Sequence, residues 1–141
     1  MATPPVVVRS TDSLWRAMDR FTATGLHFLV VLDDQDAVMG LLEDRAVAAE
    51  WVGDALRMHR TTVARLLASQ SARAASIHRL TPVDQAACAL LRQQAEALPV
   101  IGDNGRVAGV VTSMDLLRAM VAAEAAVGGR RDSRAPEAVG R

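Results

Sequence analysis

The chain has 141 residues, half of them apolar, which is enough to bury a sizeable core in one compact domain or in two small halves. Its 16 basic and 16 acidic residues cancel, and a formal net charge of zero gives no support to a broad nucleic-acid-binding surface. A single cysteine, Cys88, excludes an internal disulfide and is compatible with a reducing compartment. No apolar run approaches the length of a membrane span, and the first residues do not resemble a secretory signal. We therefore expect a soluble cytoplasmic protein that contacts neither nucleic acid nor membrane.

The first expected elements are a short strand over residues 6–9 and an amphipathic helix after it. Thr11 or Asp12 can cap this helix, because a short polar side chain there accepts a hydrogen bond from the first helical turn. The helix is predicted from apolar residues at the spacing of a buried stripe, namely Leu14, Ala17, Met18 and Phe21. Gly25 is expected to end it, since glycine readily adopts the positive φ common at helix C-termini.

A hairpin and one or two further helices are expected next. Residues 27–32 and 37–42 are mostly apolar, and the polar run 33–36 separates them as a turn. The segment 44–69 carries enough Ala, Leu, Met and Trp for one or two helices, with Thr61 or Thr62 as a second capping residue.

The same pattern returns at an offset of 69 residues without a gap, so that Leu14 falls on Val83, Phe21 on Leu90 and Gly40 on Gly109. The second copy starts with a strand at Ile77 and a helix at Thr81-Pro82, and Asn104-Gly105 is a preferred two-residue hairpin turn.

The repeat predicts an α/β fold made of tandem β-α-β-β-α units. A sheet of about three strands with helices on one face cannot bury its apolar surface alone, so two copies should pack with pseudo-two-fold symmetry around a shared core. We expect the first unit at residues 6–60 and the second at 61–126, with a linker helix at 61–70. The remainder, 127–141, has no apolar period and is expected to be disordered.

The second copy ends in a motif with a family resemblance. It contains Leu98-Pro99-Val100-Ile101, then Asn104-Gly105, then Gly109-Val110-Val111-Thr112-Ser113-Met114-Asp115. This order resembles the CBS (cystathionine β-synthase) domain family, and the resemblance covers residues 6 to about 125. It implies a stand-alone regulatory pair with two clefts between the halves, which bind AMP, ADP, ATP or S-adenosylmethionine. It also implies a homodimer and a regulated partner protein.

The residues expected to bind the nucleotide come from both copies. Thr112 stands where a strand meets a helix, so its hydroxyl and the first helical amides can contact a phosphate, and Ser113 adds a donor. Asp115 can accept two hydrogen bonds from the ribose hydroxyls. By the resemblance, the opposite copy supplies the walls around the base, at positions that correspond to Val6, His27 and Phe28.

Two simpler interpretations stay open for these residues. Thr112 and Asp115 also have the spacing of a capping box, which is compatible with a ligand at the donors that the cap leaves free. His27 can simply be the polar residue that opens a strand.

The equivalent positions in the first copy depart from the family pattern. Glu43 replaces the threonine and would repel a phosphate, while Ala46 replaces the aspartate and cannot bind a diol. We expect this second cleft to be empty or altered, and one nucleotide per chain. Arg45 is expected to form a surface ion pair with Glu43.

The leading hypothesis is a regulatory module that binds a nucleotide and catalyses nothing. The alternative is a ligand-free structural or interaction module that acts through homodimerisation or a partner protein. An enzyme has the least support, because no nucleophile, base or metal site emerges from the sequence. Cys88 is expected in the core. Trp15 and Trp51 are expected there as well, with a dimer interface as the alternative for both.

Overall fold

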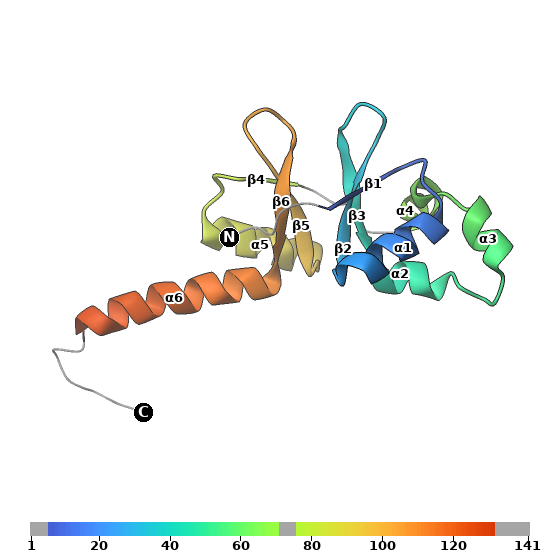
Figure 1. Cartoon of the computed structure of the whole chain (residues 1–141). Helices are drawn as coiled ribbons and strands as arrows, with labels where there is room; N and C mark the ends of the chain where they lie inside the picture. The colour runs from blue at the N-terminus through green and yellow to red at the C-terminus, as the bar shows by residue number, and fades with distance from the viewer. Residues whose placement is uncertain (1–5, 71–75, 132–141) are drawn as a thin grey trace.

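The structure is a computed structural model that describes residues 6–70 and 76–131, with the backbone alone for 128–131. The first half contains β1 (Val7–Arg9), α1 (Leu14–Thr24), β2 (Phe28–Leu32), β3 (Val38–Glu43) and α2 (Asp44–Ala49). After the short helices α3 (Ala55–Arg60) and α4 (Val63–Ser69), the second half contains β4 (Ile77–His78), α5 (Val83–Gln93), β5 (Ala97–Ile101), β6 (Val107–Thr112) and α6 (Ser113–Arg131). The order β-α-β-β-α thus occurs twice, which confirms the predicted α/β repeat (Figure 1).

The two sheets repeat each other residue by residue. Their strand orders are β1-β2-β3 and β4-β5-β6, and in each the first pair is parallel and the second antiparallel. The hairpin pairs correspond at the offset of 69 throughout, for example Phe28–Glu43 and Ala97–Thr112. Even the register shift recurs, between Val31 and Leu32 and between Val100 and Ile101. The gapless offset in the sequence therefore describes the backbone accurately.

One difference between the sheets has its cause in Pro99. In the first sheet, the Val30 N–H donates to the Val6 carbonyl at 3.0 Å, and pairing with β1 starts at Val7. Pro99 holds the equivalent place in β5 and has no amide hydrogen to donate. Pairing in the second sheet starts one position later in the repeat, at Ile77, and β4 is shorter than β1.

Short polar side chains cap α1, α3 and α4, although not always those expected. The Ser13 hydroxyl caps α1 by accepting from the Arg16 N–H at 3.1 Å. The prediction of Thr11 or Asp12 was therefore wrong, because the Asp12 carboxylate turns back to accept from the Arg9 N–H at 2.8 Å. Thr62 caps α4, as one of the two predicted alternatives.

The equivalent helices α1 and α5 both end in a left-handed residue. Gly25 closes α1 at a φ of 70°, as predicted, and its N–H donates to the Phe21 carbonyl at 2.8 Å. At the equivalent place Gln94 closes α5 at a φ of 53°. A residue with a β-carbon is strained in this conformation, so the second copy tolerates a cost that the first avoids.

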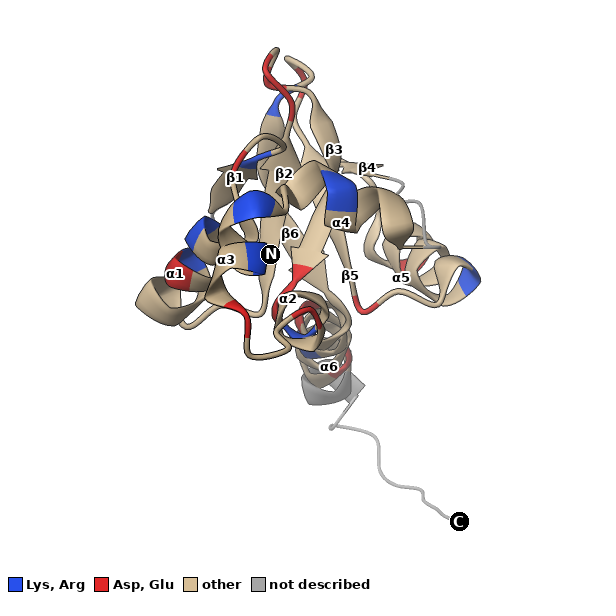
Figure 2. Cartoon of the chain, turned by 90° about the vertical axis from the view of Figure 1, so that its right-hand side faces the viewer, with Lys and Arg blue, Asp and Glu red and all other residues tan. Residues whose placement is uncertain are grey.

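The hairpin turns also correspond, and they correct the predicted Asn-Gly turn. The Gly105 N–H donates to the Gly102 carbonyl at 3.1 Å, so Asp103 and Asn104 are the central residues. Gly105 follows them at a φ of 79°, and Asp36 holds its place in the first hairpin at 66°. A hydrogen bond from the Arg9 side chain, together with the charge of that arginine, lowers the pKa of the Asp36 carboxyl. Acidic residues lie at the hairpin tips at the top of Figure 2.

Three clusters of buried side chains form the core. One lies between the first sheet and its helices and includes Leu14, Leu29 and Met58. A second repeats this arrangement in the other half around Leu90 and Val111. The third joins the two sheets, and its buried members are Val30, Leu32, Ala97 and Val110. The two halves therefore share a core, as Figure 1 shows by the sheets that face each other.

The helices between the repeats pack on the first half. Met58 of α3 and both Val63 and Leu66 of α4 are buried in the first core cluster. The sequence predicts that the linker segment 61–70 belongs to the second unit, whereas its buried side chains belong to the core of the first. A sequence boundary cannot reveal this, because α4 is adjacent to both units along the chain.

The last helix runs away from the body of the molecule (Figure 1). α6 continues to Arg131, so the prediction that disorder begins at residue 127 was wrong for residues 127–131. Residues 132–141 lie outside the described residues. The Ala-rich stretch 122–126 favours a helix up to Val127, since alanine is the strongest helix former, but it does not explain the last turn, which includes two glycines. Among the described residues, no helix is long and apolar enough to cross a membrane.

Three side chains that were expected in the core are exposed. Trp15 and Trp51 are 41% and 44% exposed, and Cys88 is exposed as well. Trp15 stacks on His59 with ring centroids 4.7 Å apart. Trp15 and Cys88 are exposed because they lie about 100° or more around their helices from the residues that face the core.

The unequal helix ends lead to a stability prediction. We expect Gln94→Gly to raise the free energy of unfolding by about 1 kcal/mol, because glycine removes the left-handed strain. Gly25→Ala should lower it by a similar amount. An added β-carbon at Gly25 meets no atom within 4 Å, so this change isolates backbone strain. Urea titration followed by circular dichroism measures both, and equal stabilities of all three proteins would contradict the assignment.

Candidate functional site

A cleft between the two halves is lined by several of the residues that were predicted to bind a nucleotide. This cleft, called cleft A here, has a volume of about 180 Å³ and is lined by Val6, Gly25, Leu26, His27, Phe28, Val110 and Thr112. The first five belong to the first half and the last two to β6 of the second. Four of the six predicted residues, namely Val6, His27, Phe28 and Thr112, thus line one cavity.

Thr112 and Asp115 form a capping box, which was one of the two interpretations of these residues from the sequence. The Asp115 N–H donates to the Thr112 hydroxyl at 3.1 Å, and the Thr112 N–H donates to the Asp115 Oδ2 atom at 3.0 Å. These bonds fix both side chains at the start of α6. The other carboxylate oxygen, Oδ1, has a looser ion pair with Arg118 at 3.7 Å.

Asp115 and Ser113 stand beside cleft A and are absent from its lining. The Asp115 side chain is 17% exposed, so its carboxylate can still be reached from solvent. The backbone N–H of Ser113 donates to the Glu96 carbonyl at 2.9 Å. This bond holds the start of α6 against the residue that precedes β5. Their roles in ligand binding stay predictions.

His27 lies at the rim of cleft A and has a defined partner. Its Nδ1 atom is 2.9 Å from the Asp44 Oδ2 atom, and the imidazole is largely exposed. The Asp44 N–H in turn donates to the His27 carbonyl at 3.0 Å. The carboxylate therefore orients the ring, and the second ring nitrogen faces away from this bond.

Three lining residues were not among the predicted site residues. Val110 lies two residues before Thr112 on the same strand, so the alternation of strand faces could have found it. Gly25 and Leu26 precede His27, and only the shape of the helix end brings these residues to the cleft. No pattern in the sequence indicates that contact.

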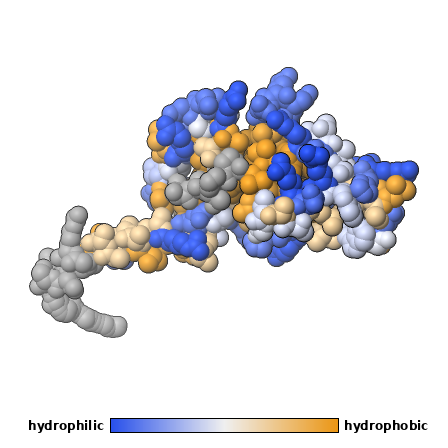
Figure 3. Space-filling view, viewed as in Figure 1, coloured by the Kyte–Doolittle hydropathy of each residue, from blue (hydrophilic) through white to orange (hydrophobic). Residues whose placement is uncertain are grey.

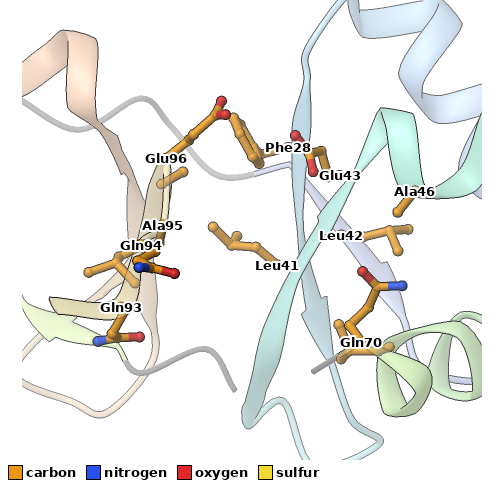
Figure 4. A pocket seen from close by; sticks show the side chains of 13 residues that line it. Phe28, Leu41, Leu42, Glu43, Ala46, Gln70, Gln93, Gln94, Ala95 and Glu96 are labelled. Atoms are coloured by element: carbon orange, nitrogen blue, oxygen red, sulfur yellow. The ribbon is translucent and has the colours of Figure 1, made fainter. Parts of the chain in front are cut away.

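A second cleft corresponds to cleft A by the repeat. This cleft B has a volume of about 230 Å³ (Figure 4), and its lining residues are Phe28, Leu41, Leu42, Glu43, Ala46, Leu67, Gln70, Gln93, Gln94, Ala95, Glu96, Ala97 and Leu98. Glu43 holds the place of Thr112, and Glu96 holds the place of His27. Ala97 replaces the aromatic ring of Phe28. The cavity is formed, but its polar groups differ completely from those of cleft A.

One arginine connects the two carboxylates at the rim of cleft B. Arg45 Nη2 lies 2.8 Å from the Glu43 Oε2 atom and 3.4 Å from the Glu96 Oε2 atom. Its hydrogen bond to Glu43 raises the pKa of the guanidinium above its usual value. The predicted surface pair of Arg45 with Glu43 is confirmed, and the link to Glu96 in the other half is new.

The described residues do not bring together three or more His, Cys, Asp or Glu side chains in a group that could hold a metal ion.

Solved structures share this architecture. CBSX2 in complex with AMP aligns with a TM-score of 0.69 and 22% identity, covering 87% of this chain and 94% of that one. The CBS domain pair of protein MJ0100, in complex with 5′-methylthioadenosine and S-adenosyl-L-methionine, gives 0.68 and 23%, covering 87% and 93%. The cytosolic domain of the Mg²⁺ channel MgtE in complex with ATP gives 0.68 and 21%, covering 84% and 46%.

The sequence comparisons name the family. An L-aspartate semialdehyde sulfurtransferase of Methanocaldococcus jannaschii is 25% identical over 118 residues, which are 84% of this chain. The chain spans only 22% of that relative's length, so the likeness concerns one part of a larger protein. The family model described as CBS domain matches residues 1–53 and 71–122, which include both copies of the repeat. The chain therefore belongs to the CBS domain family, as a tandem pair of CBS motifs.

Proposed function

We propose that this CBS pair is a regulatory module that binds an adenine nucleotide in cleft A and catalyses no reaction. The observation that carries the proposal is the composition of cleft A, which joins apolar walls from the first half to Thr112 at the start of α6. The candidate ligands are AMP, ADP, ATP and S-adenosylmethionine.

The apolar part of cleft A suits a purine ring. Val6, Phe28 and Val110 offer faces for a flat heterocycle, and the backbone around Gly25 and Leu26 offers groups for its edge. A volume of about 180 Å³ is below the roughly 300–1,000 Å³ of pockets that enclose whole drug-sized ligands. Cleft A would therefore enclose the base and leave the phosphate end near solvent.

The polar part of cleft A suits a sugar phosphate. The lining carries no acidic residue, and the N-terminus of the 19-residue helix α6 attracts anions. The Asp115 Oδ1 atom, which the capping box leaves free, can accept a ribose hydroxyl. We propose Ser113 and the outer ring nitrogen of His27 as further contacts.

A ligand at this place would act on the arrangement of the two halves. Cleft A has walls from both, so a bound nucleotide contacts both at once. It would stabilise the arrangement that it binds best, and a regulated partner protein could then distinguish the bound from the free form.

The ligands in similar solved structures support this class of function. Structures of CBS pairs contain AMP, ATP, or S-adenosylmethionine with 5′-methylthioadenosine, and CBS pairs are generally regulatory modules. The cytoplasmic location stays a prediction from the sequence.

The nucleotide proposal predicts that AMP, ADP or ATP at millimolar concentration raises the melting temperature. Asp115→Asn should weaken binding about tenfold or more, because a charge-assisted hydrogen bond contributes roughly 1.5–3 kcal/mol. Asparagine keeps an oxygen that accepts from the Thr112 N–H, so the cap should survive. Thermal shift and titration calorimetry measure both effects.

Two further variants control this experiment. Asp84→Asn removes a carboxylate from the first turn of α5, outside the lining of cleft A, and should bind like wild type. Asp115→Ala should lower the stability of the free protein by about 1 kcal/mol, because the Thr112 N–H loses its acceptor in the capping box. If wild type binds none of these compounds, including S-adenosylmethionine, the proposed ligand class is wrong.

A second candidate function, an interaction module that forms homodimers, is favoured by the surface of α6. Met114, Leu117 and Val121 recur on one side of this helix and are 53%, 53% and 67% exposed. The projecting helix is coloured largely as apolar in Figure 3. Exposed apolar faces of this kind mark contact surfaces, and we propose that a second copy of the chain covers this one.

The dimer proposal predicts a mass of about twice 15.0 kDa in light scattering. The double change Leu117→Glu with Val121→Glu should shift the protein to a monomer, because four buried charges would meet at the interface. Leu91→Glu is the matched control, since Leu91 is 77% exposed on α5. A monomeric wild type, or a dimer that survives the double change, would overturn this proposal.

A further inference from the structure

The helices α3 and α4 cover a surface of the first half whose counterpart in the second half is open. In the first half they lie beside α1 (Figure 1), and Val8 and Leu14 are 2% and 0% exposed in the core cluster that Met58 of α3 also joins. The offset of 69 leads to Ile77 and Val83, which are only partly buried. Among the described residues, the core cluster around these two contains no counterpart of α3 or α4.

Three backbone hydrogen bonds hold the covering segment against the loop that precedes α1. The loop donates once to the extended residues before α4 and accepts twice from the first amides of that helix. The bonds run from the Leu14 N–H to the Thr61 carbonyl at 2.9 Å, from the Val63 N–H to Asp12 at 2.8 Å and from the Ala64 N–H to Ser10 at 2.9 Å. Because the first amides of a helix have no partner within it, the loop caps α4 with its own backbone.

The same three backbone groups are free in the second half. The offset of 69 leads from the groups of the first loop to the Val83 N–H and to the carbonyls of Thr81 and Arg79. Within the described parts of the chain, this N–H has no acceptor and neither carbonyl has a donor. The second loop therefore lacks the segment that completes the first.

The second loop nevertheless has the same internal bonds as the first. The Arg79 N–H donates to the Ile101 carbonyl at 2.8 Å, and the Ser10 N–H donates to the equivalent Leu32 carbonyl at the same distance. A bond across three residues also recurs, at 3.0 Å in the first loop and at 2.9 Å from the Thr81 N–H in the second. The free groups thus belong to a loop that is already formed, and a binding partner would not have to order it.

A hollow of about 430 Å³ adjoins the free groups. Its lining includes Ile77 and Thr81 together with residues of α5, among them Asp84. Asp84 holds the place of Trp15, which in the first half stacks on His59 of α3 at 4.7 Å between the ring centroids. The hollow therefore lies where a counterpart of α3 would pack, and it offers a carboxylate there instead of an aromatic ring.

We propose that residues 77–84, called the open surface here, bind a segment of a partner protein that has the form of this chain's own residues 54–69. The bound segment has a Ser or Thr cap and then a helix with apolar residues at the places of Val63 and Leu66. At the place of His59 it carries a basic residue, whose charge complements Asp84. The open surface lies outside the lining of cleft A, so this binding does not depend on the nucleotide.

The test uses a fluorescent peptide with the sequence of residues 54–69 and the change His59→Lys. Anisotropy should show saturable binding to the whole chain. Hydrogen exchange of the Val83 amide should slow about tenfold or more in the complex, because this amide gains an acceptor. A control peptide that also carries Val63→Asp with Leu66→Asp should bind about tenfold more weakly or worse, because its apolar contacts are lost.

A fused chain repeats the experiment at high effective concentration. Residues 54–69 with His59→Lys are placed directly before Met1, which continues the offset of 69 because Met1 corresponds to Gln70. The tethered segment should slow exchange of the Val83 amide even where the free peptide binds too weakly to saturate the protein. The same fusion with Val63→Asp and Leu66→Asp in the added segment should leave the exchange rate unchanged.

Val83→Pro removes the proposed backbone donor. Val83 is the first residue of α5, where proline is favoured because this amide has no partner within the helix. Pro82 before it has a φ of −60° and a ψ of 151°, the extended conformation that a following proline requires. Val83→Ala is the matched control, since it shortens the side chain but keeps the N–H. Val83→Pro should bind the peptide about fivefold more weakly than Val83→Ala, as expected for one lost hydrogen bond.

Several outcomes would overturn the inference. A Val83 amide that is already protected in the chain alone would show that the chain's own residues occupy the open surface. Equal binding of the two peptides, equal binding by the two Val83 variants, or an unchanged exchange rate in the fused chain would each contradict it too. Absence of AMP binding with peptide binding intact overturns the proposed nucleotide function alone.

Discussion

The contact between the two sheets is the interaction on which the rest of the structure depends. Each three-stranded sheet has helices on one face, and a sheet of this size is not stable with its second face in water. Val30 and Leu32 from one sheet and Ala97 and Val110 from the other are less than 10% exposed, because the sheets cover each other. Both clefts border this contact, since Val110 also lines cleft A and Ala97 lines cleft B.

The repeat duplicates the backbone and leaves the side chains free to differ. Thr112 and Glu43 end equivalent strands and face equivalent cavities, yet one is a neutral hydroxyl and the other a carboxylate. The charge of each cleft is therefore set by a few substitutions on a common frame. Arg45 adds an ion pair between the halves, from Glu43 to Glu96, that has no counterpart among the described residues of cleft A.

Local patterns predicted the elements well and their ends less well. Apolar spacing located α1 and α5, because a buried stripe must recur every three or four residues. It misplaced the cap by one or two residues, since Ser13 and Asp12 are both competent and only the hydrogen bonds distinguish them. The hairpin turn shifted by one residue for a similar reason: Gly105 suits two turn types, and the register of the strands selects between them.

The sequence by itself determined the repeat, its gapless offset and the α/β class, because the order and spacing of apolar residues along the chain record them. It offered the capping box of Thr112 with Asp115 as one of two interpretations, and the hydrogen bonds of the structure confirmed it. It also predicted, through a family resemblance, that Val6, His27 and Phe28 belong with Thr112. Only the tertiary structure decided that α4 packs on the first half and that Arg45 reaches Glu96. These contacts join segments far apart in sequence, and no periodicity records how two such segments meet when their shared surface is buried.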